Sequence, residues 1–349
     1  MGERPGTAVT PGSTATRGGL SIYPLLSIAV LVLSGAAACI GAYPMGARDV
    51  LNILTAGLTG ASPDEQSAIV LYSVRLPRIA AALVLGACLA AAGTVYQQIF
   101  RNPLVSPDIL GVSSGAGLGA VLGIFLSFPV FGIQVMAFAG GMAAVALVML
   151  VASAVRRQDS VLVLVLSGIV IGALAGSITS LLKVLADPYD QLPAITFWLL
   201  GSLATVTTSD IAAALPAALV AFLPLLLLQW KVDILSMGDE EARALGVDVR
   251  KVRFALIAGA TLMTAAVVSV AGVVGWVGLI IPHFARMLVG PKFVRLLPAA
   301  ILIGSAFMLA VDTLARTISA TEVPLGIITS LIGAPVFVIL LARGRRVWS

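Results

Sequence analysis

Residues 109–155 read ILGVSSGAGLGAVLGIFLSFPVFGIQVMAFAGGMAAVALVMLVASAV and contain no charged side chain. About 20 apolar residues suffice to cross a hydrocarbon core roughly 30 Å thick, so this run is too long for a single crossing. Pro129 and Gly132 interrupt it near the middle, where proline and glycine favour a break. The run therefore predicts two consecutive membrane-spanning helices joined around these two residues.

Apolar runs recur along the rest of the chain, which is 59% hydrophobic and only 11% charged. Soluble domains carry about 25% charged residues, so a water-exposed surface cannot be built from this composition. A second long run, 254–289, divides near Gly272–Gly275 into a full helix and a short one. The other runs lie at 18–47, 79–100, 160–182, 211–230, 296–311 and 323–342. The pattern predicts an all-α polytopic membrane protein: a flexible cytoplasmic tail at 1–19 and one domain of ten transmembrane helices at 20–349.

The basic residues set the expected orientation of these helices. The chain has 21 Lys and Arg residues against 16 Asp and Glu residues. An N-terminus placed in the cytoplasm puts most of the 21 on the cytoplasmic side, as the positive-inside rule requires. An even number of crossings then returns the C-terminus to the cytoplasm. The positive charge is explained by these loops, so we expect no nucleic-acid partner.

The sequence leaves little room for chemistry within the chain. It contains no GxxxxGK[ST] phosphate loop, one histidine (His283) and two cysteines, Cys39 and Cys88, which both lie in apolar runs. Neither a nucleotide-binding domain nor a Cys/His metal site is encoded. We therefore expect no cofactor and no metal site here. If ATP and magnesium drive this protein, another chain binds them.

Glycines recur every four residues in two predicted helices, at 111, 115, 119 and 123 and again at 168, 172 and 176. Such stripes let helix backbones approach closely in lipid, which favours packing within the bundle. The alternative for the second stripe is that its helix, which also carries Ser160 and Ser167, lines a transport path.

Between Trp230 and Phe254 lies a charged segment, with a loop at 236–250 expected to contain a short helix. Ser236 is a possible N-cap, three acidic residues follow at 239–241 where the helix dipole favours them, and Gly246 can end the helix. Ala242, Ala244 and Leu245 would then be available to a partner's groove. The alternative is a solvated connector.

Asp312 is the one acidic residue that lies well inside a predicted span, and Arg316 follows it at the i,i+4 spacing. Mutual neutralisation is the favoured interpretation of this pair. Intramembrane carboxylates usually carry proton or sodium coupling, so their scarcity argues against an ion-coupled carrier. The lone His283 has no partner for an intramembrane enzyme.

Several motifs resemble, in order and spacing, the permease subunits of iron-chelate (siderophore or haem) and cobalamin ABC importers, the FecCD type. The resemblance covers nearly everything after residue 70. The stretches that carry it are Arg75-Leu76-Pro77-Arg78, Gly86 through Gln97, Asn102-Pro103-Leu104, Pro107 through Gly117, Gly238 through Val247, Gly278 through His283 with Arg286, Asp312 with Arg316, Pro324-Leu325-Gly326 and Gly333 through Phe337.

The resemblance implies a type II importer: a homodimer of ten-helix subunits in the bacterial inner membrane, two ATP-binding subunits below and an extracytoplasmic substrate-binding protein above. It implies that the chain is a permease and not an enzyme. The residues that match the family's coupling helix, which contacts the ATPase, are Gly238, Asp239, Glu240, Glu241, Ala242, Arg243, Ala244, Leu245, Gly246 and Val247. The residues that match arginines meeting glutamates of the binding protein are Arg75, Arg78 and Arg316, and guanidinium groups suit that role because they pair bidentately with carboxylates. Contact of these arginines with lipid phosphates alone is the alternative.

The family's cytoplasmic gate maps to the start of the helix at 160–182. The cobalamin permease has a Ser-Thr pair there, whereas this chain has Ser160 followed by Val161, which puts a hydroxyl gate in doubt; a hydrophobic constriction could also close a pore. The residues expected along the path and gate are Ser160, Val161, Ser167, Gly168, Gly172 and Gly176. The resemblance also matches 186–198 to a short helix at the channel entrance. A metal chelate, in the first place a ferric siderophore, is the expected substrate, with haem, cobalamin and molybdate as alternatives.

Overall fold

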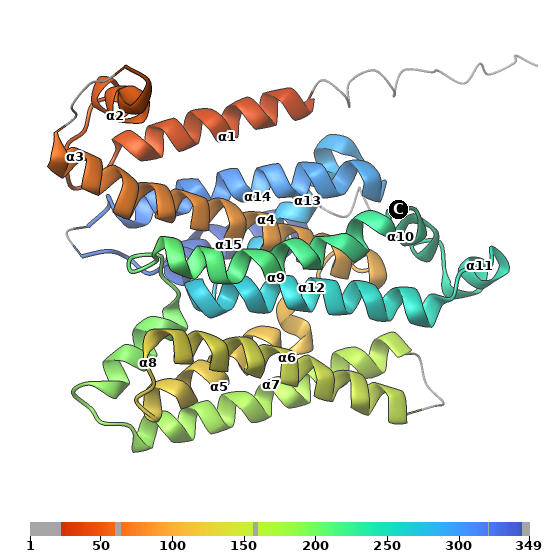
Figure 1. Ribbon diagram of the computed structural model, residues 1–349. Helices are drawn as coiled ribbons and strands as arrows, with labels where there is room; N and C mark the ends of the chain where they lie inside the picture. The colour runs from red at the N-terminus through yellow and green to blue at the C-terminus, as the bar shows by residue number, and fades with distance from the viewer. Residues whose placement is uncertain (1–21, 60–63, 156–159, 320, 344–349) are drawn as a thin grey trace, which may run out of the picture.

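The computed structural model describes residues 22–59, 64–155, 160–319 and 321–343, and within these ranges the chain is helical and contains no strand. Figure 1 shows the long helices running side by side. The tail predicted at 1–19 lies outside the described residues. In chain order the helices are α1 (Ile22–Cys39), α2 (Ala47–Thr59), α3 (Glu65–Ile69), η1 (Val70–Arg75), α4 (Leu76–Ile99), η2 (Pro107–Leu110), α5 (Val112–Phe125), α6 (Val130–Ala154), α7 (Ser160–Leu185), α8 (Gln191–Leu200), α9 (Thr208–Leu227), α10 (Gln229–Leu235), α11 (Asp239–Ala244), α12 (Val249–Ala271), α13 (Val277–Val289), α14 (Phe293–Ala315) and α15 (Leu325–Arg343).

The predicted helix breaks are confirmed. α5 ends at Phe125 and α6 begins at Val130, with Pro129 at its N-cap. α12 ends at Ala271 and α13 begins at Val277, so 272–275 lies between two helices. The short helix expected within 186–198 is α8. The amphipathic α2, which buries Val50 and Ile53, was not predicted.

Seven of the described helices are long and apolar enough to cross a membrane: α1, the helical stretch from α3 to α4, α6, α7, α9, α12 and α14. α5, α8, α13 and α15 are apolar but shorter. Each predicted crossing lies on one helix, while the count of ten stays a prediction.

Burial divides these helices into a centre and a periphery. We compared the most apolar 18-residue window of each helix by the share of its residues that are buried. This share is 78% in the α3–α4 stretch and 72% in α12, but only 11% in α1 and 17% in α9. A helix that is hydrophobic all round requires apolar surroundings on every side. α4 and α12 therefore find these surroundings inside the protein, whereas the peripheral helices require lipid or another apolar partner.

Glycines permit the close approach of α4 to its neighbours. A Cβ built on Gly86 would lie 2.1 Å from the Gly304 carbonyl oxygen of α14, and one on Gly304 would lie 2.4 Å from the Gly86 oxygen. On the other side, a Cβ on Gly93 would lie 1.9 Å from the Gly278 oxygen of α13. Only glycine fits these three positions without moving a backbone.

The first glycine stripe has the packing role predicted for it. A Cβ on Gly115 would lie 2.4 Å from the Gly140 oxygen of α6, and one on Gly119 would lie 2.0 Å from the Met136 oxygen. The stripe therefore forms a seam between α5 and α6.

Irregular backbone inside the bundle is satisfied by the chain itself. Gly201 ends α8 and Gly272 ends α12, and both take left-handed backbone, with φ of 73° and 70°. The Ser202 N–H donates to the Ala271 oxygen at 2.8 Å, and the Leu325 N–H donates to the Gly201 oxygen at 2.9 Å. Because lipid cannot satisfy free backbone groups, these bonds allow three helices to begin or end at one place.

The α4–α14 seam predicts that Gly86→Ala lowers the stability of the protein. The added methyl group must displace the α14 backbone, and overpacking of this kind costs about 1–3 kcal/mol. Thermal unfolding of the detergent-purified permease measures the effect. Gly35→Ala in α1 is the matched control, because no atom lies within 4 Å of its Cβ position. Equal melting temperatures for the two variants would contradict the close packing.

Candidate functional site

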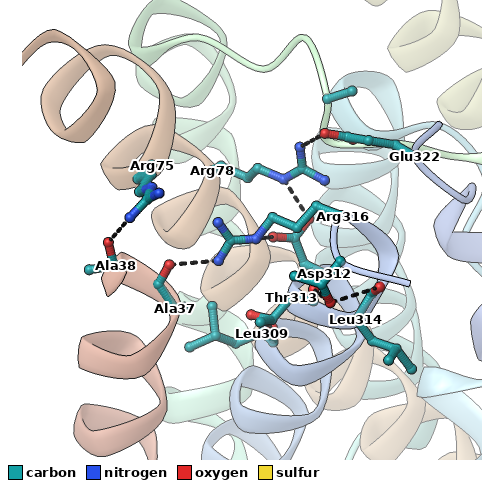
Figure 2. A network of polar contacts seen from close by, with 12 residues as sticks. Ala37, Ala38, Arg75, Arg78, Leu309, Asp312, Thr313, Leu314, Arg316 and Glu322 are labelled. Atoms are coloured by element: carbon teal, nitrogen blue, oxygen red, sulfur yellow. Dashed lines mark hydrogen bonds and ion pairs between the residues drawn. The ribbon is translucent and has the colours of Figure 1, made fainter. Parts of the chain in front are cut away.

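Arg75, Arg78 and Arg316, which were predicted to meet a binding protein, lie together in the structure. The ends of α1 and α14 and the start of α4 bring them to one place (Figure 2). The Arg78 side chain is 6% exposed, and its Nε donates to the Asp312 Oδ1 at 2.8 Å. Its Nη1 donates to the Glu322 Oε1 at 2.7 Å. Arg78 thus lies between two carboxylates of its own chain.

Arg75 and Arg316 bind the C-terminal end of α1. The Arg316 Nη2 donates to the Ala37 oxygen at 2.6 Å, and the Arg75 Nη1 donates to the Ala38 oxygen. The Arg75 Nη2 also donates to the Tyr43 oxygen. The last carbonyl groups of a helix have no partner inside that helix and carry partial negative charge, so a cation at this end is doubly favoured. The two arginines therefore anchor α1 to α4 and α14.

Asp312 is fully buried, and Arg78 is its closest cation. The distance from the Arg316 Nε to the Asp312 Oδ2 is 3.8 Å, which is an ion pair but too long for a hydrogen bond. Neutralisation of Asp312 was predicted from the i,i+4 spacing alone. The structure assigns the shorter contact to Arg78, which is distant in sequence.

Glu322 is the member of this cluster that the sequence analysis missed. It lies in the loop between α14 and α15, and its side chain is 40% exposed, against 0% for Asp312. A count of charges would have indicated it, because three clustered arginines and one aspartate leave an excess of positive charge. Arg75 and Arg78 are only 3% and 5% exposed, so a carboxylate of another protein must displace an internal partner to reach them.

The predicted loop helix is α11, at the end of the molecule opposite α2 and α3 (Figure 1). The expectation that Ser236 caps it is wrong: Gly238 occupies the N-cap, and the Ser236 hydroxyl donates to the Asp233 oxygen at 2.6 Å. The predicted ending is confirmed. Gly246 has a φ of 76°, and the Val247 N–H donates to the Ala242 oxygen at 2.9 Å, as in a Schellman motif.

The loop helix packs with one side against its own chain. Contrary to the expectation, Ala242 is fully buried and therefore not available to a partner. Ala244 is exposed, and Leu245 is 59% exposed, so these two side chains remain available. The Arg253 Nη2 of α12 contacts the Asp239 Oδ1 at 2.8 Å and holds α11 in place. These contacts leave Ala244 and the larger Leu245 exposed at the C-terminal end of α11.

Asp248 caps the start of α12 by accepting a hydrogen bond from the Lys251 N–H. This bond lowers the pKa of the Asp248 carboxyl below its usual value. A lowered pKa stabilises the fold above the unfolded-state pKa, and the stabilisation is lost as the pH falls through the folded value. At neutral pH the cap is therefore fully charged and present.

The predicted path residues on α7 have three different surroundings. Ser160 is the first residue of α7, and its side chain lies outside the described part of the structure; Val161 follows it and is half-buried. Ser167 is buried, and a Cβ on Gly168 would lie 2.1 Å from the Ile109 oxygen. By contrast, a Cβ on Gly172 would make an ordinary contact with Ser114, and one on Gly176 would have no atom within 4 Å. The glycine stripe of α7 is thus tightly packed toward the N-terminal end of the helix, at Gly168, and open toward its C-terminal end, at Gly176.

Among the described residues, no group of three or more His, Cys, Asp or Glu side chains could hold a metal ion.

The arginine cluster predicts that Asp312→Asn strongly destabilises the protein. The change leaves the buried Arg78 without its one fully buried counter-charge, and breaking a buried ion pair typically costs about 3–5 kcal/mol. Asp248→Asn is the control, because asparagine can keep the N-cap hydrogen bond and the lost ion pair with Lys251 is exposed and contributes little. Thermal unfolding of both detergent-purified variants tests this. A loss no larger for D312N than for D248N would show that the cluster does not stabilise the fold.

Known proteins are similar to this chain in sequence and in fold. The chain matches the sequence model of the FecCD transport family over residues 26–343. It is 41% identical to the molybdate import system permease protein MolB of Haemophilus influenzae, over 88% of this chain and 91% of that protein. It is 44% identical to the cobalamin import system permease protein BtuC of Halobacterium salinarum, over 81% of this chain and 76% of that one. The solved inward-facing conformation of a metal-chelate type ABC transporter superposes with a TM-score of 0.84 at 37% identity, covering 93% of this chain and 99% of that chain.

These matches extend over almost all of the described helices, so they identify the whole chain and not one motif. The resemblance seen in the motifs is confirmed, as is the all-α permease fold. The protein is a multi-pass protein of the inner membrane, and it is not an enzyme, because ATP hydrolysis belongs to a separate subunit. The chain belongs to the FecCD transport family and is the permease subunit of an ABC importer.

Proposed function

We propose that this permease imports a metal chelate, in the first place a ferric siderophore, as a homodimer with both termini in the cytoplasm. The observation that carries the proposal is the separation of two charged clusters at opposite ends of the bundle: the arginine cluster beside α3, and α11 at the far end (Figure 1). A substrate-binding protein docks at the first and an ATPase at the second. ATP binding then favours one conformation of the permease over another by its differential affinity for the two.

α11 is suited to contact an ATPase because an ion pair fixes it to α12 while its C-terminal end is exposed. The Arg253–Asp239 ion pair joins it to α12, one of the two most buried helices. Displacement of α11 would therefore be transmitted to the centre of the bundle. The exposed Leu245 offers an apolar contact at the tip.

The arginine cluster is suited to bind carboxylates of another protein, which would replace a carboxylate of this chain. Glu322 is the most exposed of the groups around Arg78, so a carboxylate of the binding protein would displace it first. Docking would then also disturb the contacts of Arg75 and Arg316 with α1, which connects the outer surface to the bundle.

A homodimer would bury the open side of α7. The most apolar window of this helix is only 28% buried in one subunit, and Gly176 has empty space beside it. A path between two copies of α7 would be lined by Gly172, Gly176 and small hydroxyl side chains. Its width would suit a bulky chelate, while haem, cobalamin and molybdate are the alternatives.

We expect Glu322→Gln to strengthen the binding of the cognate binding protein by about tenfold, because the competing charge on Arg78 is removed. Surface plasmon resonance on the reconstituted permease measures the affinity. Asp64→Asn is the control, since Asp64 lies near the same end and its side chain accepts hydrogen bonds from Ser67 instead of an arginine. Unchanged or weaker binding of E322Q would exclude the exchange of carboxylates.

We expect Leu245→Asp to reduce ATP-dependent uptake of a ferric siderophore to below about a tenth of the wild-type rate, because a charge replaces an exposed apolar contact. Uptake is measured in proteoliposomes that contain the permease, its ATPase and its binding protein, with haem, cobalamin and molybdate as competing substrates. Lys251→Gln is the control, because its side chain is 86% exposed and lies outside α11. Uptake that continues without ATP would overturn the importer mechanism, and preferential uptake of a competitor would reassign the substrate.

A further inference from the structure

An open cavity of about 520 Å³, lined by both polar and apolar surface, lies near α11 and takes no part in the function proposed above. The C-terminal end of α4, the helix α10 and the turn between α13 and α14 line it. Its lining residues are Gln97, Gln98, Arg101, Asn102, Pro103, Asp233, Ser236, Arg286, Pro291 and Lys292.

The cavity is positively charged, with three cationic side chains against one carboxylate. The carboxylate is already engaged, because the Asp233 Oδ1 accepts a hydrogen bond of 2.7 Å from the Phe293 N–H at the start of α14. Among the residues that the structure describes, Arg101, Arg286 and Lys292 make no ion pair with any carboxylate. The cavity therefore has uncompensated positive charge.

The walls of the cavity hold Arg286 in a fixed position. The Arg286 Nη2 donates to the Gln97 Oε1 at 3.2 Å, and the Gln97 Nε2 donates to the Leu279 oxygen at 3.0 Å. On the other wall, the Gln98 Nε2 donates to the Pro291 oxygen at 2.9 Å. Both glutamines are buried, so these bonds are shielded from water. Arg286 is itself half-buried and has only a neutral partner, which is unfavourable for a cation unless an anion binds beside it.

The position of the cavity indicates where an anion would come from. Arg101 follows the C-terminal end of α4, and Lys292 immediately precedes α14, so both lie at the ends of apolar helices. The ends of membrane-spanning helices reach the headgroup region of a bilayer, and basic pockets between transmembrane helices bind anionic headgroups. Met287 and Leu288 follow Arg286 and are 65% and 52% exposed, which provides apolar surface for acyl chains.

We propose that this cavity is a binding site for a phosphate group, held by Arg101, Arg286 and Lys292. Guanidinium groups bind phosphate oxygens bidentately, and the lysine adds a point charge. The phosphate belongs to the headgroup of an anionic lipid or to a free phosphate compound. Since Asp233 and Ser236 belong to the segment that leads into α11, a bound phosphate would brace the base of the loop helix.

The test compares the full-length permease with the double variant Arg286→Gln/Lys292→Gln in nanodiscs of phosphatidylcholine, with and without phosphatidylglycerol. Native mass spectrometry measures retained lipid, and thermal unfolding in inorganic phosphate tests the free anion. Arg295→Gln is the matched control, because Arg295 is exposed near the start of α14 but does not line the cavity. Arg101→Gln is a second cavity variant whose exposed side chain makes misfolding unexpected.

We expect wild type and R295Q to retain phosphatidylglycerol at least about tenfold better than the double variant, since each cation near an anionic lipid adds several-fold in affinity. Stabilisation of wild type, but not of the cavity variants, by inorganic phosphate alone would assign the site to a free phosphate compound. Equal binding of phosphatidylglycerol and phosphate by wild type and the two cavity variants would overturn the proposal. Normal lipid binding combined with loss of ATPase binding in the variants would also overturn it, and would make the cavity part of a protein interface.

Discussion

The close approach of α4 to α14 and α13 is the constraint on which the rest of the structure depends. Gly86, Gly93, Gly278 and Gly304 allow backbone to meet backbone, and no side chain larger than hydrogen fits there. In lipid, helices gain nothing from leaving water, so dispersion contacts at such seams hold the bundle together. The same contacts bring the start of α4 beside the end of α14, which is where the arginine cluster forms.

The two charged clusters described above lie at the two ends of this apolar bundle, and the charges act differently at each end. At the arginine cluster the charges are buried and satisfied within the chain, by Asp312, Glu322 and the last carbonyl groups of α1. At α11 the ion pair Arg253–Asp239 joins an exposed helix to the buried α12. The arginine cluster can therefore exchange its internal carboxylate for one of a partner protein. At the other end of the bundle, α11 can move as a unit with α12.

Helix positions were predictable because they depend on local properties. Pro129 and Gly272 mark breaks wherever the helices are placed in space, and the acidic first turn and Gly246 define α11 from its own residues. Partners were less predictable. The i,i+4 spacing suggested Arg316 as the partner of Asp312, but Arg78 is closer, and Glu322 was not considered. These pairs join residues that lie far apart in the chain, so no local pattern indicates them.

The sequence by itself determined the class of protein, the helix breaks and the family, because hydropathy, glycine spacing and collinear motifs are properties of the chain alone. Only the tertiary structure decided which charges meet, which side of α11 is buried and which glycines are seams. A stripe of glycines is the same in sequence whether it packs, as at Gly119, or faces open space, as at Gly176. The difference depends on which helix lies opposite, and that is set by packing between distant segments.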